Sequence, residues 1–536
     1  MTATSSRPSN GASVNVTNAT NANAAAGPSA GKRQGKGGGR LISAEPLTTK
    51  AVRGASWTIA TSVGSRAIGL VGTLAITYFL VPEIIGEVSD ASVLILSAMQ
   101  LSTIGVGQYV IAKPNAGRDV AWHATVFHMA LGLLAIGLVT LFRERFGGFL
   151  SAPTMARYVP GLALAAVFDR VAFMPERLLA RDMQFRVIGL SRTVGEVTYS
   201  IASVALAFAG LGGMALVLAN VARSILRCAM LCMAVDRREW LTPSPLSKVT
   251  TRAMLAFGLP FSVSASASFA ARRWDNLLVS NFFGPTVLGE YNLAYNLADI
   301  PAVQVGEQIG DVLLPSFSHM GPAQRKRALV RSTALLALIV FPLAVGLGAV
   351  ANTAVATLLR KEWHSVGPML TLLAALSVAR PVGWTIASYL VAREMTRPLM
   401  WLGLFQVASL LACIATIGRA GPLWTCVAVG VAFGAHALAS MVVVARADNI
   451  TVASLVMSCV GPLLACIPLV LAVIGARHGL AWLGEMPRGV GLAVEIIAGG
   501  LGYVGGAFLL ARKTAADFLG LVRSALGRRA AGRSSA

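Results

Sequence analysis

Charged residues are scarce in this chain of 536 amino acids. Only 13% of its residues are Asp, Glu, Lys or Arg, whereas 55% are hydrophobic, and the mean hydropathy is +0.68. A single soluble domain of this composition would carry more apolar surface than one core can bury. The scarcity of charge therefore excludes one soluble domain, and it predicts a protein whose helices lie in a lipid bilayer.

Cysteine is also rare, and no metal-binding pattern accompanies it. Cys228 and Cys232 lie one helical turn apart, but no His or carboxylate stands at ligand spacing from them. All six cysteines fall inside apolar runs, where a cysteine is usually a small buried side chain: Cys228, Cys232, Cys413, Cys426, Cys459 and Cys466. We expect no metal site, no structural disulfide and no cofactor.

The first 50 residues lack large apolar side chains. They are rich in Ser, Asn, Ala and Gly, and they end in a basic stretch, residues 31–40. Such a segment cannot bury enough surface to offset the entropy of ordering it, so we expect it to be disordered. It also lacks the central apolar stretch of a signal peptide. The first apolar run, from about Gly54, is expected to act as an uncleaved start of membrane insertion.

Long apolar runs, in contrast, are abundant. A spanning helix needs roughly 20 mostly apolar residues, and this rule predicts about fourteen spans. They centre near residues 68, 100, 131, 164, 198, 222, 267, 302, 340, 378, 408, 434, 463 and 499. The predicted fold class is an all-α polytopic membrane protein. No connecting loop is long enough to carry a catalytic site, which argues against a membrane glycosyltransferase, polysaccharide polymerase or ligase.

The net charge of +22 is distributed unevenly among the predicted loops. With a cytoplasmic N-terminus, the even-numbered loops carry 16 Lys or Arg and the odd-numbered loops carry 8, and both tails fall on the richer side. This bias follows the positive-inside rule. Most of the positive charge thus serves membrane topology, so we expect no nucleic-acid partner, and we expect both termini to be cytoplasmic.

One segment of the chain is repeated. The stretch Val81-Pro-Glu-Ile-Ile-Gly-Glu-Val-Ser-Asp-Ala91 matches Gly284-Pro-Thr-Val-Leu-Gly-Glu-Tyr-Asn-Leu-Ala294 at an offset of 203 residues (285 minus 82). Each copy lies between two apolar runs, which predicts the outer turn of a helical hairpin at the start of each half. Internal duplication is typical of transporters, whose halves close around a site at mid-membrane.

The repeat divides the chain into predicted parts. Two six-helix halves are followed by two additional helices and a tail. The boundaries are 1–50 for the disordered extension, 51–240 and 241–449 for the halves, 450–512 for the two additional helices and 513–536 for the basic cytoplasmic tail.

Arginines inside the spans indicate a binding site for an anion. Arg66 lies in the first span, and Arg272 and Arg273 lie in the equivalent span of the second half. A charge at the bilayer centre costs roughly 2.5–3.5 kcal/mol on the insertion scale, so each must face a partner or water. In the repeat register Arg66 falls one turn from Arg273, and the planar guanidinium suits phosphate. We expect all three to bind substrate. The alternative is neutralisation within the bundle, for example between Arg272 and Asp275, three residues apart.

Acidic residues follow one face of the next predicted span. Asp299, Glu307 and Asp311 are spaced by eight and then four residues, which places them on one side of a helix. Together with Asp275 they are candidates for ion coupling or charge pairing. This face would hold a coupling cation, pair with the arginines at 272 and 273, or line a wet crevice near the cytoplasm, and the last is our expectation.

Other charged residues in the spans suggest structural roles. Arg192 and Glu196 are four residues apart and are expected to pair with each other, whereas Asp169 and Arg170 cannot share a helix face. Arg380 precedes Pro381, and a proline inside a span predicts a break in that helix.

The region from residue 255 to residue 320 resembles a known family. It contains Phe257-Gly-Leu-Pro260, Arg273-Trp-Asp275, the stretch from Gly284 to Ala298 with its paired Tyr-Asn-Leu-Ala, Pro301, and Leu314-Pro-Ser-Phe-Ser318. These motifs resemble bacterial polysaccharide transporters, the Wzx-type flippases of the multidrug, oligosaccharidyl-lipid and polysaccharide exporter superfamily. The resemblance covers about residues 50–515.

The resemblance implies a function without covalent chemistry. A Wzx-type flippase moves an oligosaccharide repeat unit, linked to polyprenyl diphosphate, across the cytoplasmic membrane for exopolysaccharide, capsule, O-antigen or other lipopolysaccharide synthesis. Its partners would be that substrate, membrane lipids, and polysaccharide polymerase and chain-length proteins. The alternative is a cation-coupled multidrug antiporter of the same superfamily. Such an antiporter would favour acidic residues in the first half, whereas the first span offers Arg66 and no carboxylate.

Overall fold

The computed structural model describes residues 67–112, 117–318, 320–482 and 487–520, together with Gly64 and Arg523. Every regular element within these ranges is a helix. The first described helix is Ala67–Ile76. The first half then contains α2 (Pro82–Leu101), α3 (Val106–Ala112), α4 (Arg118–Leu141), α5 (Arg143–Phe149), α6 (Val159–Arg181), α7 (Phe185–Phe208) and α8 (Gly213–Ala234).

The second half and the C-terminal helices follow the same pattern of long helices and short turns. They are α9 (Lys248–Ser318), α10 (Pro322–Leu358), α11 (Val366–Leu376), α12 (Arg380–Ala392), α13 (Thr396–Thr416), α14 (Pro422–Asp448), α15 (Val452–Leu464), α16 (Cys466–Trp482) and α17 (Arg488–Leu510). A last helix covers residues 512–520.

The predicted all-α polytopic fold class is confirmed. Thirteen of the fourteen predicted span centres fall within α-helices of the described chain, and the centre near 378 falls on the 3-10 turn between α11 and α12. Ten segments of the described chain are both long and apolar enough to cross a membrane, and each contains one of the predicted centres; the other four centres, near 68, 164, 198 and 302, lie in helical stretches outside these ten. The helices α6 and α7 have 23 and 24 residues, so they are also long enough to span.

The longest element, α9, is two helices joined at one glycine. Its 71 residues are interrupted at Gly284, where φ is 80° and ψ is 178°. A side chain disfavours a positive φ, which explains a glycine at this turn. Pro285 then begins the second helical segment, as Pro82 begins α2, because proline suits the first turn of a helix. The two repeat copies therefore start equivalent helices.

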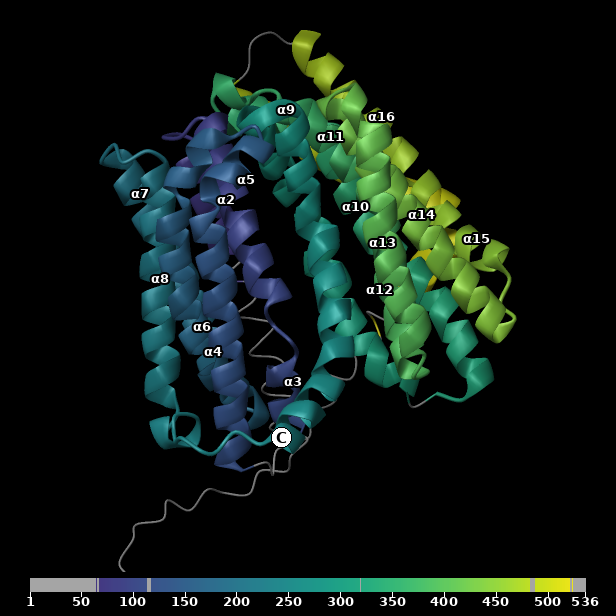
Figure 1. The fold of residues 1–536 in the computed structure, drawn as a ribbon. Coiled ribbons are helices and arrows are strands. Elements are labelled where there is room, and N and C mark those ends of the chain that lie inside the picture. Colours follow the sequence, from purple (N-terminus) through teal and green to yellow (C-terminus); the bar gives the residue numbers. More distant parts are fainter. Residues whose placement is uncertain are drawn as a thin grey trace, which may run out of the picture. The chain divides into compact units, whose positions relative to one another are not determined.

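The helices gather into two groups that meet along α2 and α9. In the first group α6 packs on α8, and α7 packs on α8. In the second group α10 packs on α11, α13 packs on α14, and α16 and α17 form a hairpin that packs on α10 (Figure 1). The most extensive contact between the halves joins α2 to α9.

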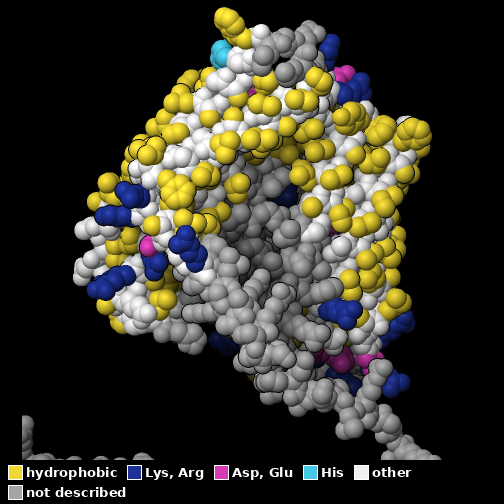
Figure 2. Space-filling view, turned by 180° about the vertical axis from the view of Figure 1, so that it is seen from behind, with side chains coloured by type: hydrophobic (Ala, Val, Ile, Leu, Met, Phe, Trp, Pro, Cys, Tyr) yellow, Lys and Arg dark blue, Asp and Glu magenta, His cyan; other side chains and the backbone are white. Residues whose placement is uncertain are grey.

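The surface has the distribution of side chains expected in a bilayer. Figure 2 shows a wide area of hydrophobic side chains, with Lys and Arg side chains gathered at its left edge, at its lower right and at the top of the view. Large apolar residues such as Phe208, Val249 and Leu509 are 78–80% exposed. Lipid rather than water is the solvent that such side chains require.

The predicted break before Pro381 is confirmed. The helix α11 ends at Leu376, a 3-10 turn covers Ser377–Ala379, and α12 begins at Arg380. Pro381 thus stands at the first turn of α12, where its missing N–H costs no hydrogen bond. The break places the Arg380 side chain at the start of a new helix.

Candidate functional site

The two repeat copies pack directly against each other. A Cβ added to Gly86 would overlap the carbonyl oxygen of Pro285, and a Cβ added to Gly289 would overlap the carbonyl oxygen of Pro82. Because Gly86 and Gly289 are repeat partners, as are Pro82 and Pro285, the two contacts are the same contact made twice. The halves are therefore related here by an approximate two-fold axis.

A polar pair marks the position of this axis. The Asn292 amide donates a hydrogen bond to the Ser89 hydroxyl, and these two residues are also repeat partners, separated by the offset of 203. A residue that contacts its own equivalent must lie on or beside the two-fold axis. We call Pro82, Gly86 and Ser89 with Pro285, Gly289 and Asn292 the repeat interface.

Residues just before each repeat copy reach across to the other half. The Trp363 indole N–H donates to the Thr77 carbonyl at 3.2 Å, and Ser280, the equivalent of Thr77, donates to the Leu150 carbonyl at 3.1 Å. The Tyr78 hydroxyl donates to the Leu358 carbonyl at 3.1 Å. Asn281, the equivalent of Tyr78, donates to the Phe149 carbonyl. Each half thus donates hydrogen bonds to the other half. Together with the repeat interface, these hydrogen bonds close the end of the molecule at which α2 begins.

The 3-10 turn before α6, Pro153–Arg157, also holds the start of α2. Thr154 and Arg157 both donate to the buried Glu87 carboxylate, the latter at 3.0 Å. Arg157 also donates to the Tyr158 hydroxyl, and burial of that hydroxyl raises the pKa of Tyr158. The phenol therefore stays protonated beside Glu87.

The polar residues of α9 lie next to this closed end. Asp275 is buried and accepts a hydrogen bond from the Tyr291 hydroxyl at 2.7 Å. Asn276 donates to Asn292 at 3.2 Å, and Trp274 donates to Ser97 of α2 at 3.2 Å. The centre of α9 is thus fastened both to the repeat interface and to the first half.

The two arginines that precede these residues are not fastened in this way. The Arg272 side chain is exposed and that of Arg273 is half-buried. Neither forms an ion pair or hydrogen bond with another residue of the described chain. Arg272 and Asp275, whose spacing permits a pair, do not form one; Asp275 accepts from Tyr291 and interacts electrostatically with Arg273. Within the described part of the chain, this apolar helix thus carries two guanidinium groups without an ion-pair partner.

A third arginine is held in an aromatic site of the second half. Arg380 pairs with Asp299 and donates to the Tyr295 hydroxyl at 2.7 Å. Its guanidinium carbon lies 4.2 Å from the centre of the Phe433 ring, which is favourable for a cation. Asp299 is therefore charge-paired, but its partner comes from α12. The expectation that it only lines a wet crevice is wrong.

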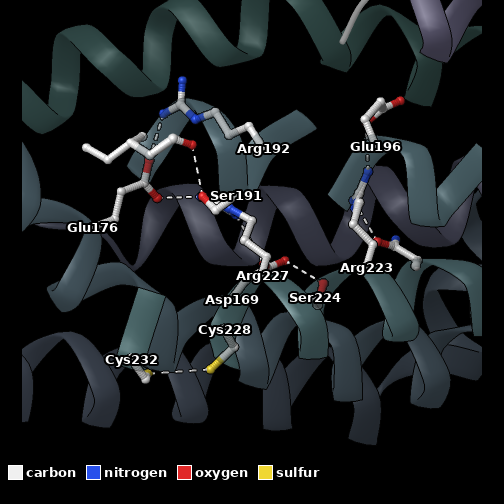
Figure 3. A network of polar contacts seen from close by, with 12 residues as sticks. Asp169, Glu176, Ser191, Arg192, Glu196, Arg223, Ser224, Arg227, Cys228 and Cys232 are labelled. Atoms are coloured by element: carbon white, nitrogen blue, oxygen red, sulfur yellow. Dashed lines mark hydrogen bonds and ion pairs between the residues drawn. The ribbon is translucent and has the colours of Figure 1, made fainter. Parts of the chain in front are cut away.

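The first half contains a network of ion pairs that the sequence did not reveal (Figure 3). Glu176 of α6 accepts from Arg192 of α7 at 2.7 Å and from Arg227 of α8. The predicted pair between Arg192 and Glu196 is wrong, because Glu196 instead lies 3.9 Å from Arg223. These contacts join three helices, so they hold the first half together.

The two neighbours Asp169 and Arg170 point to different helices, as predicted. Asp169 accepts from Ser224 at 3.1 Å and from Arg227 at 3.3 Å, both on α8. Arg170 is only 1% exposed and donates to the Met99 carbonyl at 2.6 Å. One turn of α6 thus binds α8 on one side and α2 on the other.

Three of the predicted site residues remain outside this description. Arg66 and the side chains of Glu307 and Asp311 lie outside what the structure describes.

All six cysteines are free thiols, and Cys228 and Cys232 lie with their sulfurs 3.9 Å apart. Within the described ranges no group of three His, Cys, Asp or Glu side chains is arranged to hold a metal ion.

The fold and these contacts define a class of protein: a membrane transporter fold of two repeated helical halves that meet around a shared axis. Comparison with known families then identifies the chain. The family model described as "Polysaccharide biosynthesis protein" matches residues 76–368, more than half of the chain, so the chain belongs to this family.

Individual relatives agree with this family. The chain is 24% identical over 349 residues to the lipopolysaccharide biosynthesis protein WzxC of Escherichia coli K12, covering 65% of this chain and 71% of the relative. It is 24% identical over 384 residues to the succinoglycan biosynthesis transport protein ExoT of Rhizobium meliloti 1021, covering 70% and 77%. With the apolar helices, these relatives make it a multi-pass bacterial membrane protein.

A solved structure shares the fold. The inward closed conformation of the lipid II flippase MurJ aligns with a TM-score of 0.70 at 14% identity, covering 85% of this chain and 99% of that structure. At this identity the likeness concerns the fold.

Proposed function

We propose that this protein is a flippase that translocates polyprenyl-diphosphate-linked oligosaccharide repeat units across the bacterial cytoplasmic membrane. The product would supply a surface polysaccharide, such as an exopolysaccharide, a capsule or an O-antigen. The observation that carries the proposal is the family match over residues 76–368, which includes both repeat copies and all of α9. The names of WzxC and ExoT associate those relatives with lipopolysaccharide and succinoglycan synthesis.

The arginines of the spans would bind the diphosphate. Arg272 and Arg273 present two guanidinium groups at one depth; neither forms an ion pair with a described carboxylate, although Arg273 interacts electrostatically with Asp275. Arg66, one turn away in the repeat register, would supply a third cation from the first half. A guanidinium donates two parallel N–H groups to a phosphate, which fixes both the charge and the orientation of the headgroup.

Translocation would alternate between two closures of the halves. The described chain is closed at the repeat interface, so substrate would be released at that end only after the interface separates. The ion-paired first half would move as one body, because Glu176 of α6 pairs with Arg192 of α7 and Arg227 of α8, and Asp169 of α6 also pairs with Arg227. No bond in the substrate is made or broken, so no catalytic residue is assigned.

The topology and partners complete the proposal. We place both termini in the cytoplasm and retain the parts 1–50, 51–240, 241–449, 450–512 and 513–536. A polysaccharide polymerase and chain-length proteins would act on the translocated unit. Asp275, Glu307 and Asp311 are our candidates for coupling to a cation gradient.

The test is a mass-spectrometric measurement of polyprenyl-diphosphate lipids in a strain that lacks this protein. We expect a completed repeat unit to accumulate and one surface polymer to disappear, and wild-type protein to restore both. Unchanged lipids and polymer, together with greater sensitivity to cationic drugs, would contradict the proposal and favour the multidrug antiporter. Loss of polymer with repeat units already at the outer face would favour a polymerase or ligase.

A further inference from the structure

A basic pocket lies far from the repeat interface, at the start of α10. It has a volume of about 580 Å³ and lies between the first turns of α10, the turn before α15, and the last helix, residues 512–520. Lys326, Arg327 and Arg331 contribute from α10, and Lys513 contributes from the last helix. We call these four residues and Asp517 the basic pocket.

The charges of the basic pocket are not balanced. Its one carboxylate, Asp517, forms an ion pair with Arg331 at 3.2 Å, and both side chains are about half exposed. Exposed pairs of this kind are weak. Lys326, Arg327 and Lys513 have no carboxylate partner among the described residues. The pocket therefore carries an excess of three positive charges.

The remaining lining changes from polar to apolar along α10. Arg327 and Arg331 are one turn apart with Val330 between them, and the next turn presents Ala334 and Leu335 to the pocket. The hydroxyl groups of Ser458 and Thr514 also line it. A ligand that matches this lining has an anionic end that accepts hydrogen bonds and an apolar end that lies along the helix.

The height of the pocket in the membrane agrees with such a ligand. The long apolar run of α10 begins just after Arg331, so the basic residues lie where the apolar region ends. They also belong to the end of the molecule that is richer in Lys and Arg, which the positive-inside rule assigns to the cytoplasm. Basic pockets between spanning helices at this level bind anionic lipid headgroups.

We propose that the basic pocket binds the phosphodiester headgroup of an anionic membrane phospholipid, with an acyl chain along Ala334 and Leu335. The bound lipid joins α10 to the last helix through Arg327 and Lys513, so it stabilises the second half. This inference is independent of the transported substrate, because the pocket lies outside the repeat interface and the α9 arginines.

The experiment uses the full-length protein, purified in a neutral detergent. Native mass spectrometry measures binding of dioleoylphosphatidylglycerol and dioleoylphosphatidylcholine, and thermal unfolding measures stabilisation by each. The pocket variant combines Lys326→Ala, Arg327→Ala and Lys513→Ala. The matched control combines Arg118→Ala, Arg237→Ala and Arg238→Ala, which removes three exposed cations that do not line the basic pocket.

We expect the wild-type protein to prefer phosphatidylglycerol, and we expect at least a tenfold loss of that binding in the pocket variant. The control should bind within twofold of wild type, and Asp517→Asn should bind at least as tightly. If the triple variant does not fold, the single exposed change Lys513→Glu replaces it with the same expectation. Equal binding in wild type and pocket variant would overturn the proposal. Inorganic phosphate that stabilises the protein as well as phosphatidylglycerol does would also overturn it, in favour of a soluble anion.

Discussion

Replacing Gly86 with alanine would place a methyl group on the carbonyl oxygen of Pro285 and force α2 away from α9. Inserting a methyl group into a packed contact costs about 1–3 kcal/mol. The strain is present only while the halves touch, so it lowers the ratio of closed to open protein at this end by about 5- to 150-fold. By the approximate two-fold symmetry, Gly289→Ala should have a similar effect through Pro82.

The intrinsic effect of alanine on a helix can be removed with a control. Alanine favours a helix over glycine by about 1 kcal/mol in any conformation. Gly137 of α4 has no atom within 4 Å of an added Cβ. Gly137→Ala therefore shares the gain in helix propensity without the collision, and it should leave the closed population unchanged.

The assay is a disulfide cross-link between the two residues on the axis. Because Ser89 and Asn292 are hydrogen-bonded, the pair Ser89→Cys and Asn292→Cys should cross-link under mild oxidation when this end is closed. We expect a lower yield and less exported polymer when Gly86→Ala or Gly289→Ala is added. Unchanged cross-linking and export in both variants, with Gly137→Ala as the reference, would refute the idea that these glycines permit closure.

Three further tests concern the charged residues. Arg273→Ala should abolish polymer export at unchanged protein level. Arg273→Lys should retain only part of the export, because lysine lacks the planar guanidinium. Wild-type export from the alanine variant would contradict the proposed site. Glu176→Gln leaves two arginines without their shared carboxylate, so thermal unfolding should show a loss of stability of about 3 kcal/mol. The control is Glu144→Gln, because the Glu144 side chain is 84% exposed. It should change stability by less than about 0.5 kcal/mol. Asp299→Asn and Arg380→Gln should each destabilise the protein, with a coupling of about 0.5–3 kcal/mol in the double-mutant cycle; simple additivity would show that the pair does not act as one unit.

The positions of the spans and the repeat could be predicted from the sequence because both depend on local patterns. Apolar runs set the helices whatever their neighbours are, and Gly284 and Pro285 set the turn by their own backbone preferences. The equivalence of the two turns follows from their matching residues. None of this requires knowledge of which helices touch.

The partners of the charged residues could not be predicted in the same way. Arg192 and Glu196 have the spacing of a helical pair, but Arg192 instead donates to Glu176 on a neighbouring helix. Glu176 also forms an ion pair with Arg227. Asp299 likewise finds its partner in α12, about eighty residues later in the chain. Spacing reports which residues share a helix face, whereas pairing depends on which faces meet.

The pair on the axis shows what fusion of two copies into one chain allows. In a symmetric dimer of separate halves, a residue on the two-fold axis would face its own copy, and one side chain would have to serve as both donor and acceptor. Here the two positions are encoded separately, and one has become Asn while the other has become Ser. The amide donates and the hydroxyl accepts, so the two ends of this hydrogen bond are chemically distinct. The hydrogen bond on the axis is therefore asymmetric, which it could not be in a symmetric dimer. The two halves of the single chain are free to acquire different roles in transport.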